Sequence, residues 1–408
     1  MSHQSSQSLP VIVVGAGPVG LTAALALHHL GIPTAILEKD PEGRQRPGSR
    51  AIYVHQKTLE LLEGIAPGLG WTMARHGIVW PVKRTWFRGR EVYARRYPPP
   101  DPQKLPPFTS LPQVEIERHL WDALHRTDVP VYWNEEVQQL TVADNAVHLV
   151  TSAQRQWEAA YVIGADGAHS TVRHQAGIRM EGSRSANTYI VVDVAEDEAH
   201  PLPLERVFHY EHPAMEGRNV LFVPFAGGWR IDLQLYRDDA VDAFAGLDGV
   251  RSWLPRILPA FYQDRVTWVS TYQFLQVVAE SFVDAHHRLL LTGEAAHLFA
   301  PFGARGFNSG VPDAILAARA ADAALKASDE GERVAAIRSF ADERRRAALY
   351  NRDAAGIALE HIQGESAGMR AKRAAAALLS PVWPEFGRWL DEGPYGPRSS
   401  PPGVSTKY

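Results

Sequence analysis

The sequence predicts an α/β fold in which a parallel β-α-β domain is interrupted by a mainly antiparallel β-sheet and followed by helices. Near the start, the apolar run Val11 to Val14, the helical stretch Leu21 to Leu30 and the apolar run Thr34 to Leu37 are separated by turns that contain glycine. This order is typical of a strand, a helix and a second strand parallel to the first. Further along, apolar and polar residues alternate, as in half-buried antiparallel strands. The later part is rich in alanine, leucine and arginine, which favours helices.

The elements between these regions follow in order. Residues 98–112 contain seven prolines and are expected to form a long irregular connection. Apolar positions at helical spacing from Ile116 to Leu124 predict a helix. A hairpin is expected over 137–150 with its turn at Asp144-Asn145, and Tyr161 to Ile163 predicts another strand.

Period-two alternation is clearest at 229–235 and 266–274, so the antiparallel sheet is placed in the middle of the chain. Helices are expected from Asp313 onward, and the proline-rich end is expected to be flexible. The predicted organisation is a flexible N-terminus (1–10), a discontinuous β-α-β domain (11–85, 111–180 and 281–346), an inserted sheet domain (86–110 and 181–280), C-terminal helices (347–392) and a flexible tail (393–408).

Composition excludes several classes of protein. The 408 residues are 45% apolar and 22% charged, which is ordinary globular usage and argues against disorder. The net charge of −4 and the absence of a basic stripe argue against a nucleic-acid partner, and no apolar run is long enough for a membrane helix. The chain has no cysteine, and its histidine pairs lack metal-ligand spacing, so no metal site is predicted. The polar first ten residues do not look like a signal peptide, so a cytoplasmic location is expected.

The first chemical motif is the turn after the first strand. Gly15, Gly17 and Gly20 form a GxGxxG pattern that opens a helix. Such glycines let the backbone approach a pyrophosphate, whose charge is stabilised at the helix N-terminus. Glu38, at the end of the next strand, can accept hydrogen bonds from a ribose, and its charge would repel a 2′-phosphate. The motif therefore predicts a dinucleotide site that suits FAD or NAD better than NADP. A glycine-rich turn with a purely structural role is the less favoured interpretation.

Two further motifs follow in the later part of the chain. The first is Gly164-Ala165-Asp166-Gly167, where a strand again leads into a helix. The second is Gly293-Glu294-Ala295-Ala296-His297, which is followed by the glycine-rich stretch from Pro301 to Gly310. Each one alone is compatible with a structural turn, but a nicotinamide-only dehydrogenase has no role for either.

With these three motifs in this order, the sequence resembles the single-component FAD-dependent aromatic hydroxylases related to p-hydroxybenzoate hydroxylase. The resemblance runs from about Val11 to Arg346. Ser49-Arg50-Ala51, Leu111-Pro112-Gln113 and the stretch from Pro301 to Gly310 look nearest to the phenol and 3-(3-hydroxyphenyl)propionate hydroxylases.

The resemblance implies FAD as the bound cofactor, NADH or NADPH as a transient electron donor and O2 as co-substrate. Asp166 would organise the FAD side of the site, and Pro301 with the backbone from Gly303 to Asn308 would lie along the flavin ring. The cofactor-binding residues implied in this way are Gly15, Gly17, Gly20, Glu38, Lys39, Arg50, Gln113, Asp166, Glu294, Pro301, Gly303, Gly306, Phe307 and Asn308.

The chain departs from the family pattern at two places. The family has Gly-Asp where this chain has Gly293-Glu294, and the glutamate keeps the charge but adds a methylene group. The usual Gly-Gly-Gln-Gly is Gly303-Ala304-Arg305-Gly306 here, a variant associated with the phenolic branch. We expect FAD binding to survive these changes with shifted geometry.

The expected reaction is hydroxylation of a phenolic or other electron-rich aromatic compound through a flavin C4a-hydroperoxide, with the protein supplying orientation and exclusion of water. Candidate catalytic residues are His55 as a base, Tyr272 as a hydrogen-bonding partner of a phenol, and Pro301 beside the ring. A surface or helix-capping role is the alternative for His55. The substrate is expected against the inserted sheet, with candidates Phe222, Arg230, Asp232, Gln234, Trp268, Tyr272 and Phe274, although alternation does not tell which strand face lines the pocket.

Other interpretations stay open at this stage. The same cofactor could support epoxidation or Baeyer–Villiger oxidation in natural-product tailoring, or the protein could be a non-catalytic FAD-binding protein that stabilises a ligand. The partner is expected to be a small aromatic molecule, and the protein a monomer or a homodimer. His297 is expected to brace its motif turn, and the run Arg344 to Arg346 to be a solvated helix face.

Overall fold

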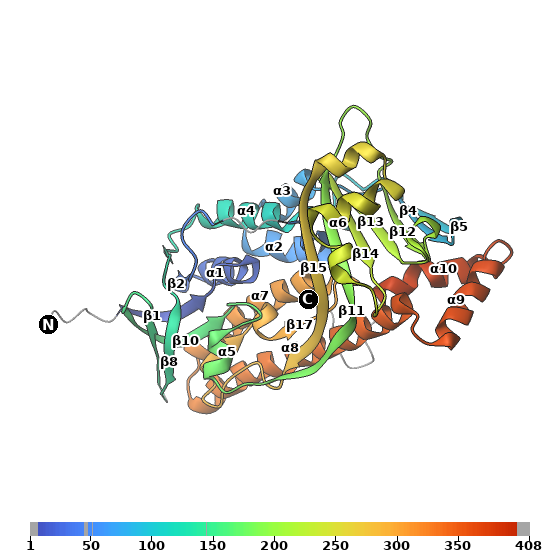
Figure 1. The fold of residues 1–408 in the computed structure, drawn as a ribbon. Helices are drawn as coiled ribbons and strands as arrows, with labels where there is room; N and C mark the ends of the chain where they lie inside the picture. Colours follow the sequence, from blue (N-terminus) through green and yellow to red (C-terminus); the bar gives the residue numbers. More distant parts are fainter. Residues whose placement is uncertain (1–6, 45–47, 51, 144, 398–408) are drawn as a thin grey trace.

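A computed structural model describes residues 7–44, 48–50, 52–143 and 145–397, in which two large β-sheets are joined by long helices (Figure 1). The first sheet is mixed: its central strands are parallel and its last two form an antiparallel meander. Its order is β7 (Val131–Tyr132), β2 (Thr34–Leu37), β1 (Gln7–Val14), β10 (Gln156–Gly164), β9 (Val147–Thr151) and β8 (Val137–Val142), with β16 (Leu289–Leu291) paired to β10.

The second sheet is larger and mainly antiparallel, and only β12 and β4 pair in parallel. A separate antiparallel pair is formed by β3 (Tyr53–His55) and β6 (Phe108–Ser110), which precede and follow β4 and β5 of the second sheet in the sequence. The order of the second sheet is β17 (His297–Leu298), β15 (Val266–Ala279), β11 (Met180–Ala195), β14 (Gly228–Gln234), β13 (Val220–Phe225), β12 (Glu205–Tyr210), β4 (Val82–Phe87) and β5 (Arg90–Arg96).

Helices cover the first sheet and extend beneath the second. α7 packs on α1 and on α8, and α8 runs along the lower side of the molecule in Figure 1. The α-helices are α1 (Pro18–His29), α2 (Gln56–Ile65), α3 (Leu69–His76), α4 (Gln113–Leu124), α5 (Thr171–Gln175), α6 (Gly246–Trp253), α7 (Arg305–Leu325), α8 (Glu330–Gln363), α9 (Ala367–Leu379) and α10 (Pro384–Glu392). Short 3₁₀ helices are η1 (Pro213–Met215), η2 (Val241–Ala243), η3 (Leu254–Arg256), η4 (Ala260–Arg265), η5 (Gly293–Ala295) and η6 (Gly393–Tyr395).

The predicted α/β class, with its β-α-β start and its antiparallel sheet, is confirmed. The second half of β1, Val11 to Val14, and the whole of β2 are buried on both faces, which explains their continuous apolar runs. The predicted hairpin corresponds to β8 and β9, and Asp144 in its turn lies outside the described residues. No helix in the described part of the chain is long and apolar enough to cross a membrane.

Both ends of the chain differ from the prediction. Residues 7–10, expected to be flexible, belong to β1, which pairs with β10 from Gln7 onward. Residues 393–397 were also expected to be flexible, but η6 packs against α8. Residues 398–408 of the predicted tail lie outside the described part. α8 continues without a break across Arg346, where a boundary was placed, and β4 begins at Val82, ahead of the boundary at 85.

Candidate active site

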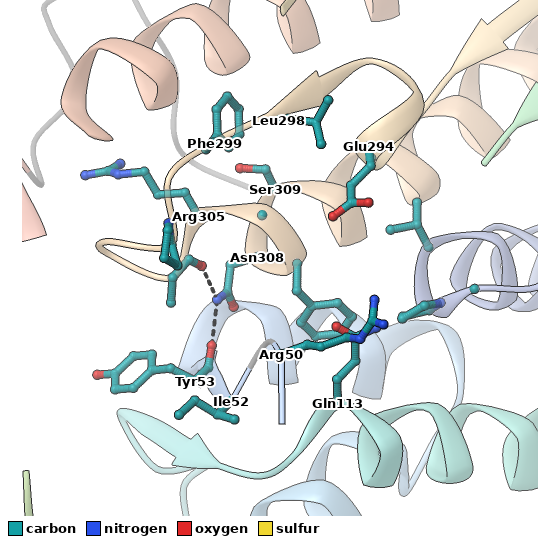
Figure 2. A pocket seen from close by; sticks show the side chains of 18 of the residues that line it. Arg50, Ile52, Tyr53, Gln113, Glu294, Leu298, Phe299, Arg305, Asn308 and Ser309 are labelled. Carbon is teal, nitrogen blue, oxygen red and sulfur yellow. Dashed lines mark hydrogen bonds between the residues drawn. The ribbon is translucent and has the colours of Figure 1, made fainter. Parts of the chain in front are cut away.

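One cavity of about 1210 Å³ extends from the turn after β1 to the inner face of the second sheet. Ligand pockets of drug-sized molecules usually occupy about 300–1,000 Å³. This cavity therefore has room for a large cofactor together with a small aromatic ring. Figure 2 shows its middle section, where Arg50, Gln113 and Glu294 surround the space near Asn308.

The glycine turn at one end has no room for side chains. Gly15 has φ +98°, and a Cβ atom there would lie 2.6 Å from the carbonyl oxygen of Ala165. A Cβ atom on Gly20 would lie 1.9 Å from the carbonyl oxygen of Gly15. Gly17, Pro18 and Val19 at the start of α1 line the cavity, and the first turn of a helix has backbone N–H groups without a partner inside the helix. The turn thus leaves backbone donors accessible to a pyrophosphate, as predicted for this motif.

Glu38 is buried beside this turn. Its carboxylate accepts hydrogen bonds from the backbone N–H groups of Ala16 (2.6 Å) and Asp40 (3.0 Å). Arg44 lies 3.4 Å from the same carboxylate and also donates to the carbonyl oxygen of Ala16. Glu38 and Lys39 both line the cavity. The carboxylate therefore braces the glycine turn and retains lone pairs that a ribose hydroxyl could use.

Asp166 lies in the turn between β10 and α5 and lines the cavity. It accepts hydrogen bonds from the Ser170 hydroxyl (2.6 Å) and from the backbone N–H of Val172 (3.1 Å). Burial raises the pKa of this carboxyl above its ordinary value, although these hydrogen bonds act in the opposite direction. Its visible role is to hold the turn after β10 next to Gly15.

The turn at Ser49 and Arg50 is fastened to the second sheet. The carboxylate of Asp193 accepts from both the N–H (2.6 Å) and the hydroxyl (2.7 Å) of Ser49, and the Arg230 guanidinium donates to the carbonyl oxygen of Arg50. Arg50 has a left-handed backbone with φ +42°, which is uncommon outside glycine. These contacts hold the strained turn so that Arg50 lines the cavity beside Gln113 (Figure 2). The pKa of the buried Asp193 is raised by its burial.

The start of α7 forms the opposite wall and is fixed by Asn308. Its amide donates to the carbonyl oxygens of Tyr53 (2.8 Å) and Ala304 (2.7 Å), drawn in Figure 2. Its side-chain oxygen accepts from the N–H of His55 (2.9 Å) and the hydroxyl of Thr58 (2.7 Å). With both ends of the amide engaged, Asn308 connects α7 to β3 and α2, while Gly303, Gly306 and Phe307 line the cavity.

Replacing Asn308 is expected to loosen this wall. Asn308→Ala removes four hydrogen bonds, and we expect the free energy of unfolding in urea to fall by about 2–3 kcal/mol. Asn308→Asp should cost at least as much, since a carboxylate oxygen would face two carbonyl oxygens. Asn145→Ala, at an exposed hairpin position, serves as the control and should change stability little. Equal stabilities of the Asn308→Ala and Asn145→Ala proteins would contradict this role.

Glu294 points into the cavity from η5, and its neighbour Gly293 is held by α7. The N–H of Gly293 donates to Asp313 (3.1 Å), and a Cβ atom on Gly293 would come within 2.9 Å of Val19. Glu294 is exposed to the cavity and makes no hydrogen bond or ion pair with the described residues. Its longer side chain is therefore accommodated without displacing the turn.

Behind this turn lies a fully buried charged cluster. Asp313 accepts from His297 Nε2 (2.6 Å) and from Arg344 Nε (2.6 Å), and all three side chains are at most 1% exposed. Burial alone would raise the pKa of Asp313, but the positive charge of Arg344 and the contact with His297 outweigh it and lower the pKa. The predicted bracing role of His297 is confirmed. The prediction that Arg344 lies on a solvated helix face was wrong. Its side chain is buried between α8 and α7, where it pairs with Asp313.

The second sheet forms the wall of the cavity opposite the glycine turn. Side chains alternate between the two faces of each strand, so only some of the predicted residues line the cavity. Leu221 and Val223 line the cavity, whereas Phe222 between them packs into the core on the other face, so its predicted place in the pocket was wrong. The predicted place of Gln234 in the pocket was wrong as well. Gln234 does not line the cavity, and its side-chain oxygen accepts a hydrogen bond from the side-chain amide of Asn219 (2.8 Å). Trp268 packs against Gly48 and does not line the cavity either.

Four of the predicted sheet residues do line the cavity: Arg230, Asp232, Tyr272 and Phe274. Arg230 Nε donates to Asp232 (2.7 Å), so these two charges compensate each other. The Tyr272 hydroxyl has no hydrogen-bond partner among the described residues.

The other two candidate catalytic residues lie near the start of α7 and its neighbouring helix. His55 precedes α2, lines the cavity and meets the Tyr53 ring edge-on, and Pro301 lines the cavity as well. The structure thus brings all three candidate catalytic residues to one cavity.

Sequence reasoning missed the contribution of the C-terminal segment. Pro394 and Tyr395 line the cavity. Arg305, which replaces the family glutamine, donates to the carbonyl oxygens of Tyr395 and Pro397 (both 2.9 Å) and to Asn351 (2.8 Å). The Gly-Ala-Arg-Gly variant was the available signal, because an arginine at a helix start has the reach to hold a distant segment.

These features together define a dinucleotide-binding domain of the kind that holds FAD: a glycine turn without room for side chains, a carboxylate after the second strand and a long cavity. The chain belongs to the family described as FAD binding domain, whose model matches residues 8–351.

Relatives agree with the resemblance predicted from the motifs. The chain is 28% identical over 318 residues to a 3-(3-hydroxy-phenyl)propionate/3-hydroxycinnamic acid hydroxylase of Mycolicibacterium smegmatis, covering 76% of this chain and 54% of that protein. It is 28% identical to a flavin-dependent monooxygenase of Mycobacteroides abscessus, covering 75% and 66% of the two chains. The chain thus spans about half the length of the hydroxylases it matches.

A solved structure with the same fold is p-nitrophenol 4-monooxygenase from Pseudomonas putida, with a TM-score of 0.76, 23% identity and coverage of 96% of this chain and 100% of that one. A second is a flavin-dependent monooxygenase in complex with FAD and substrate, with a TM-score of 0.75, 21% identity and coverage of 95% and 72%.

Proposed function

We propose that this protein is an NAD(P)H-dependent FAD monooxygenase that hydroxylates a phenolic or other electron-rich aromatic compound. The observation that carries the proposal is the single cavity that joins the glycine turn to a sheet face with aromatic and polar side chains. A protein that only bound a dinucleotide would not need the second half of this cavity.

The residues present fit FAD along the first half. The turn at Gly15 and Gly20 and the start of α1 would hold the pyrophosphate, and Glu38 the adenosine ribose. Arg50, Gln113 and Glu294 would hold the phosphate and ribityl region, where Figure 2 shows them around one space.

Bound and reduced FAD supplies the activation of O2 for transfer of one oxygen atom to an aromatic ring. The backbone N–H groups at the start of α7 would stabilise negative charge on the ring system, because a helix N-terminus carries a partial positive charge. Pro301 would exclude water from the reacting face. An imidazole nitrogen of His55 would accept the proton of the phenol, and the Tyr272 hydroxyl would hold the phenol oxygen in place.

The test is oxidation of NADH and NADPH in air by the FAD-loaded protein, with and without a panel of phenols, and with H2O2 measured alongside. We expect one class of phenol to stimulate oxidation, with much less H2O2 than reductant consumed. Stoichiometric H2O2 with every compound would contradict coupled hydroxylation by these phenols. No oxidation by protein that carries FAD would favour the non-catalytic ligand-binding protein.

Analysis of the product distinguishes the remaining alternative. A hydroxylated ring is the expected product. An epoxide or an ester formed by oxygen insertion would instead assign the protein to epoxidation or Baeyer–Villiger oxidation.

A further inference from the structure

Tyr395, in the C-terminal segment 393–397, connects the two walls of the cavity. Its carbonyl oxygen accepts a hydrogen bond from Arg305 at the start of α7 (2.9 Å). Its ring lies against the second sheet, 4.8 Å from the guanidinium of Arg206 in β12 and 3.9 Å from the ammonium group of Lys83 in β4. Tyr395 therefore reaches from the helix that follows the glycine-rich stretch to the sheet against which the substrate is expected.

The cavity stops at this ring. Tyr395 and Arg206 line the cavity, whereas Lys83 and Asp391 do not. The Lys83 ammonium lies 2.9 Å from the Asp391 carboxylate, and both side chains are at most 1% exposed. A buried ion pair thus occupies the space on the far side of the ring, so the cavity cannot continue past Tyr395.

The backbone of the segment is held in place on the side of the helices. Arg305 also donates to the carbonyl oxygen of Pro397 (2.9 Å) and to the side chain of Asn351 in α8 (2.8 Å). Gly396 has φ +63°, and a Cβ atom there would lie 2.1 Å from the carbonyl oxygen of Ala354 in α8. α10, which precedes the segment, packs on β4 and β5 of the second sheet (Figure 1). Arg305 is therefore the positioning residue of this wall.

These contacts favour a fixed wall over a lid that opens. Segments that open locally have few buried contacts, whereas the Tyr395 ring packs on two cations and its backbone is bound to α7. Part of the remaining cavity wall is apolar, formed by members of one hydrophobic cluster: Trp80, Phe108, Leu221, Val223 and Phe302. An apolar wall accepts an aromatic ring, and a fixed end limits how far that ring system can extend.

We propose that Tyr395 is a specificity-determining residue that restricts the substrate to phenols with a single aromatic ring. A second ring would need the space that the Tyr395 ring fills. The side chain acts through its size, and its hydroxyl group is not required. The inference deepens the proposed function and rests on it in taking the occupant of the cavity to be a phenolic compound.

The test is equilibrium binding to the FAD-loaded protein without reductant, followed by the change in the flavin absorption spectrum. The probes are phenol and 3-methylphenol, with one ring, and 3-phenylphenol, 4-phenylphenol and 2-naphthol, with two. In the wild type, we expect the second ring to add no affinity. In Tyr395→Ala, at least one two-ring phenol should bind about 10- to 100-fold more tightly than in the wild type, because the vacated space can bury a whole ring. The one-ring phenols should stay within about threefold.

Matched variants separate size from other effects. Tyr395→Phe keeps the ring and should exclude two-ring phenols as the wild type does. Tyr236→Ala removes a tyrosine that also packs on an arginine, Arg218 at 4.9 Å, but lies outside the cavity, and it should leave binding unchanged. If Tyr395→Ala does not retain FAD, Tyr395→Leu replaces the ring by a smaller side chain and should shift two-ring binding in the same direction by a smaller factor.

Three results would overturn the proposal. The first is equal affinity of two-ring phenols for the wild type and Tyr395→Ala. The second is a Tyr395→Phe protein that behaves like Tyr395→Ala, which would assign the role to the hydroxyl group. The third is the same change for one-ring and two-ring phenols, which would indicate a general loosening of the segment.

The proposed function can fail separately. Selection by size that depends on Tyr395, without oxygen transfer to any phenol, would leave the wall standing and remove the hydroxylase. Coupled hydroxylation by a wild type that binds two-ring phenols as tightly as Tyr395→Ala does would leave the hydroxylase standing and remove the wall.

Discussion

Gly20→Ala is expected to abolish FAD retention during purification and to weaken FAD binding by about 100-fold or more. A methyl group at this position would lie 1.9 Å from the carbonyl oxygen of Gly15, and neither atom belongs to a flexible side chain. The turn must move by more than an ångström to relieve this clash. Strain of about 3 kcal/mol in the bound geometry corresponds to a factor of about 100 in affinity. Flavin absorbance after gel filtration, and titration of the apoprotein with FAD, measure the effect.

The control for this substitution is Gly64→Ala. Gly64 lies inside α2, and a Cβ atom there meets nothing within 4 Å. Alanine in a helix is favoured over glycine by up to about 1 kcal/mol, so this protein should be slightly more stable and should retain FAD. A Gly20→Ala protein that retains FAD like Gly64→Ala would refute the assignment of this turn to the pyrophosphate.

Asp313→Ala is expected to cost about 3–5 kcal/mol of unfolding free energy, or to leave the protein insoluble. The substitution removes the partner of a guanidinium that is 1% exposed, and an uncompensated buried charge is among the largest single penalties known in proteins. Asp322→Ala, in the same helix α7, removes only a pair with the exposed Lys326 and should change stability by less than about 0.5 kcal/mol. Urea denaturation of the apoproteins compares the two.

The same cluster predicts how stability depends on pH. Although burial opposes it, the neighbouring Arg344 and His297 lower the pKa of Asp313 in the folded state. A carboxyl with a lowered folded-state pKa stabilises the protein fully above its unfolded pKa of about 3.9, and this contribution is lost as the pH falls further towards the folded-state pKa. Asp313→Asn should therefore show a weaker loss of stability below pH about 4 than the wild type does.

Adding Arg344→Met to Asp313→Asn should restore part of the lost stability, because no buried charge of that pair is then left alone. If the double variant were less stable than Asp313→Asn, the charge of Arg344 would not be the cause of the loss.

The sequence correctly predicted those parts of the fold and of the site whose geometry is determined by residues that are close together in the chain. The glycine turn, Glu38 and the strand that ends at Gly164 are each defined by a few consecutive residues, because the geometry of a strand, turn and helix is set locally. The sheet residues were harder. A shift of one residue exchanges the two faces of a strand, so Leu221 and Val223 line the cavity where Phe222 had been expected.

The remaining errors concern residues whose positions depend on contacts with parts of the chain that are distant in sequence. Arg344 looked like a surface residue in a run of arginines, and only the packing of α8 on α7 brings it to Asp313. Gln7 to Pro10 carry no apolar pattern, yet they extend β1 because β10 offers a paired edge. Tyr395 lies in a proline- and glycine-rich stretch, and its place follows from Arg305, some ninety residues away.

The position of Tyr395 has a consequence for biosynthesis. The walls of the cavity come from residues as early as Val14 and as late as Tyr395, so the chain must leave the ribosome through Tyr395 before the cavity can close. At the usual rates of translation, the glycine turn exists for tens of seconds without its opposite wall. Until Tyr395 has been synthesised and has packed, a nascent chain can offer the cofactor only a surface that is open on one side, so tight capture must wait for that segment.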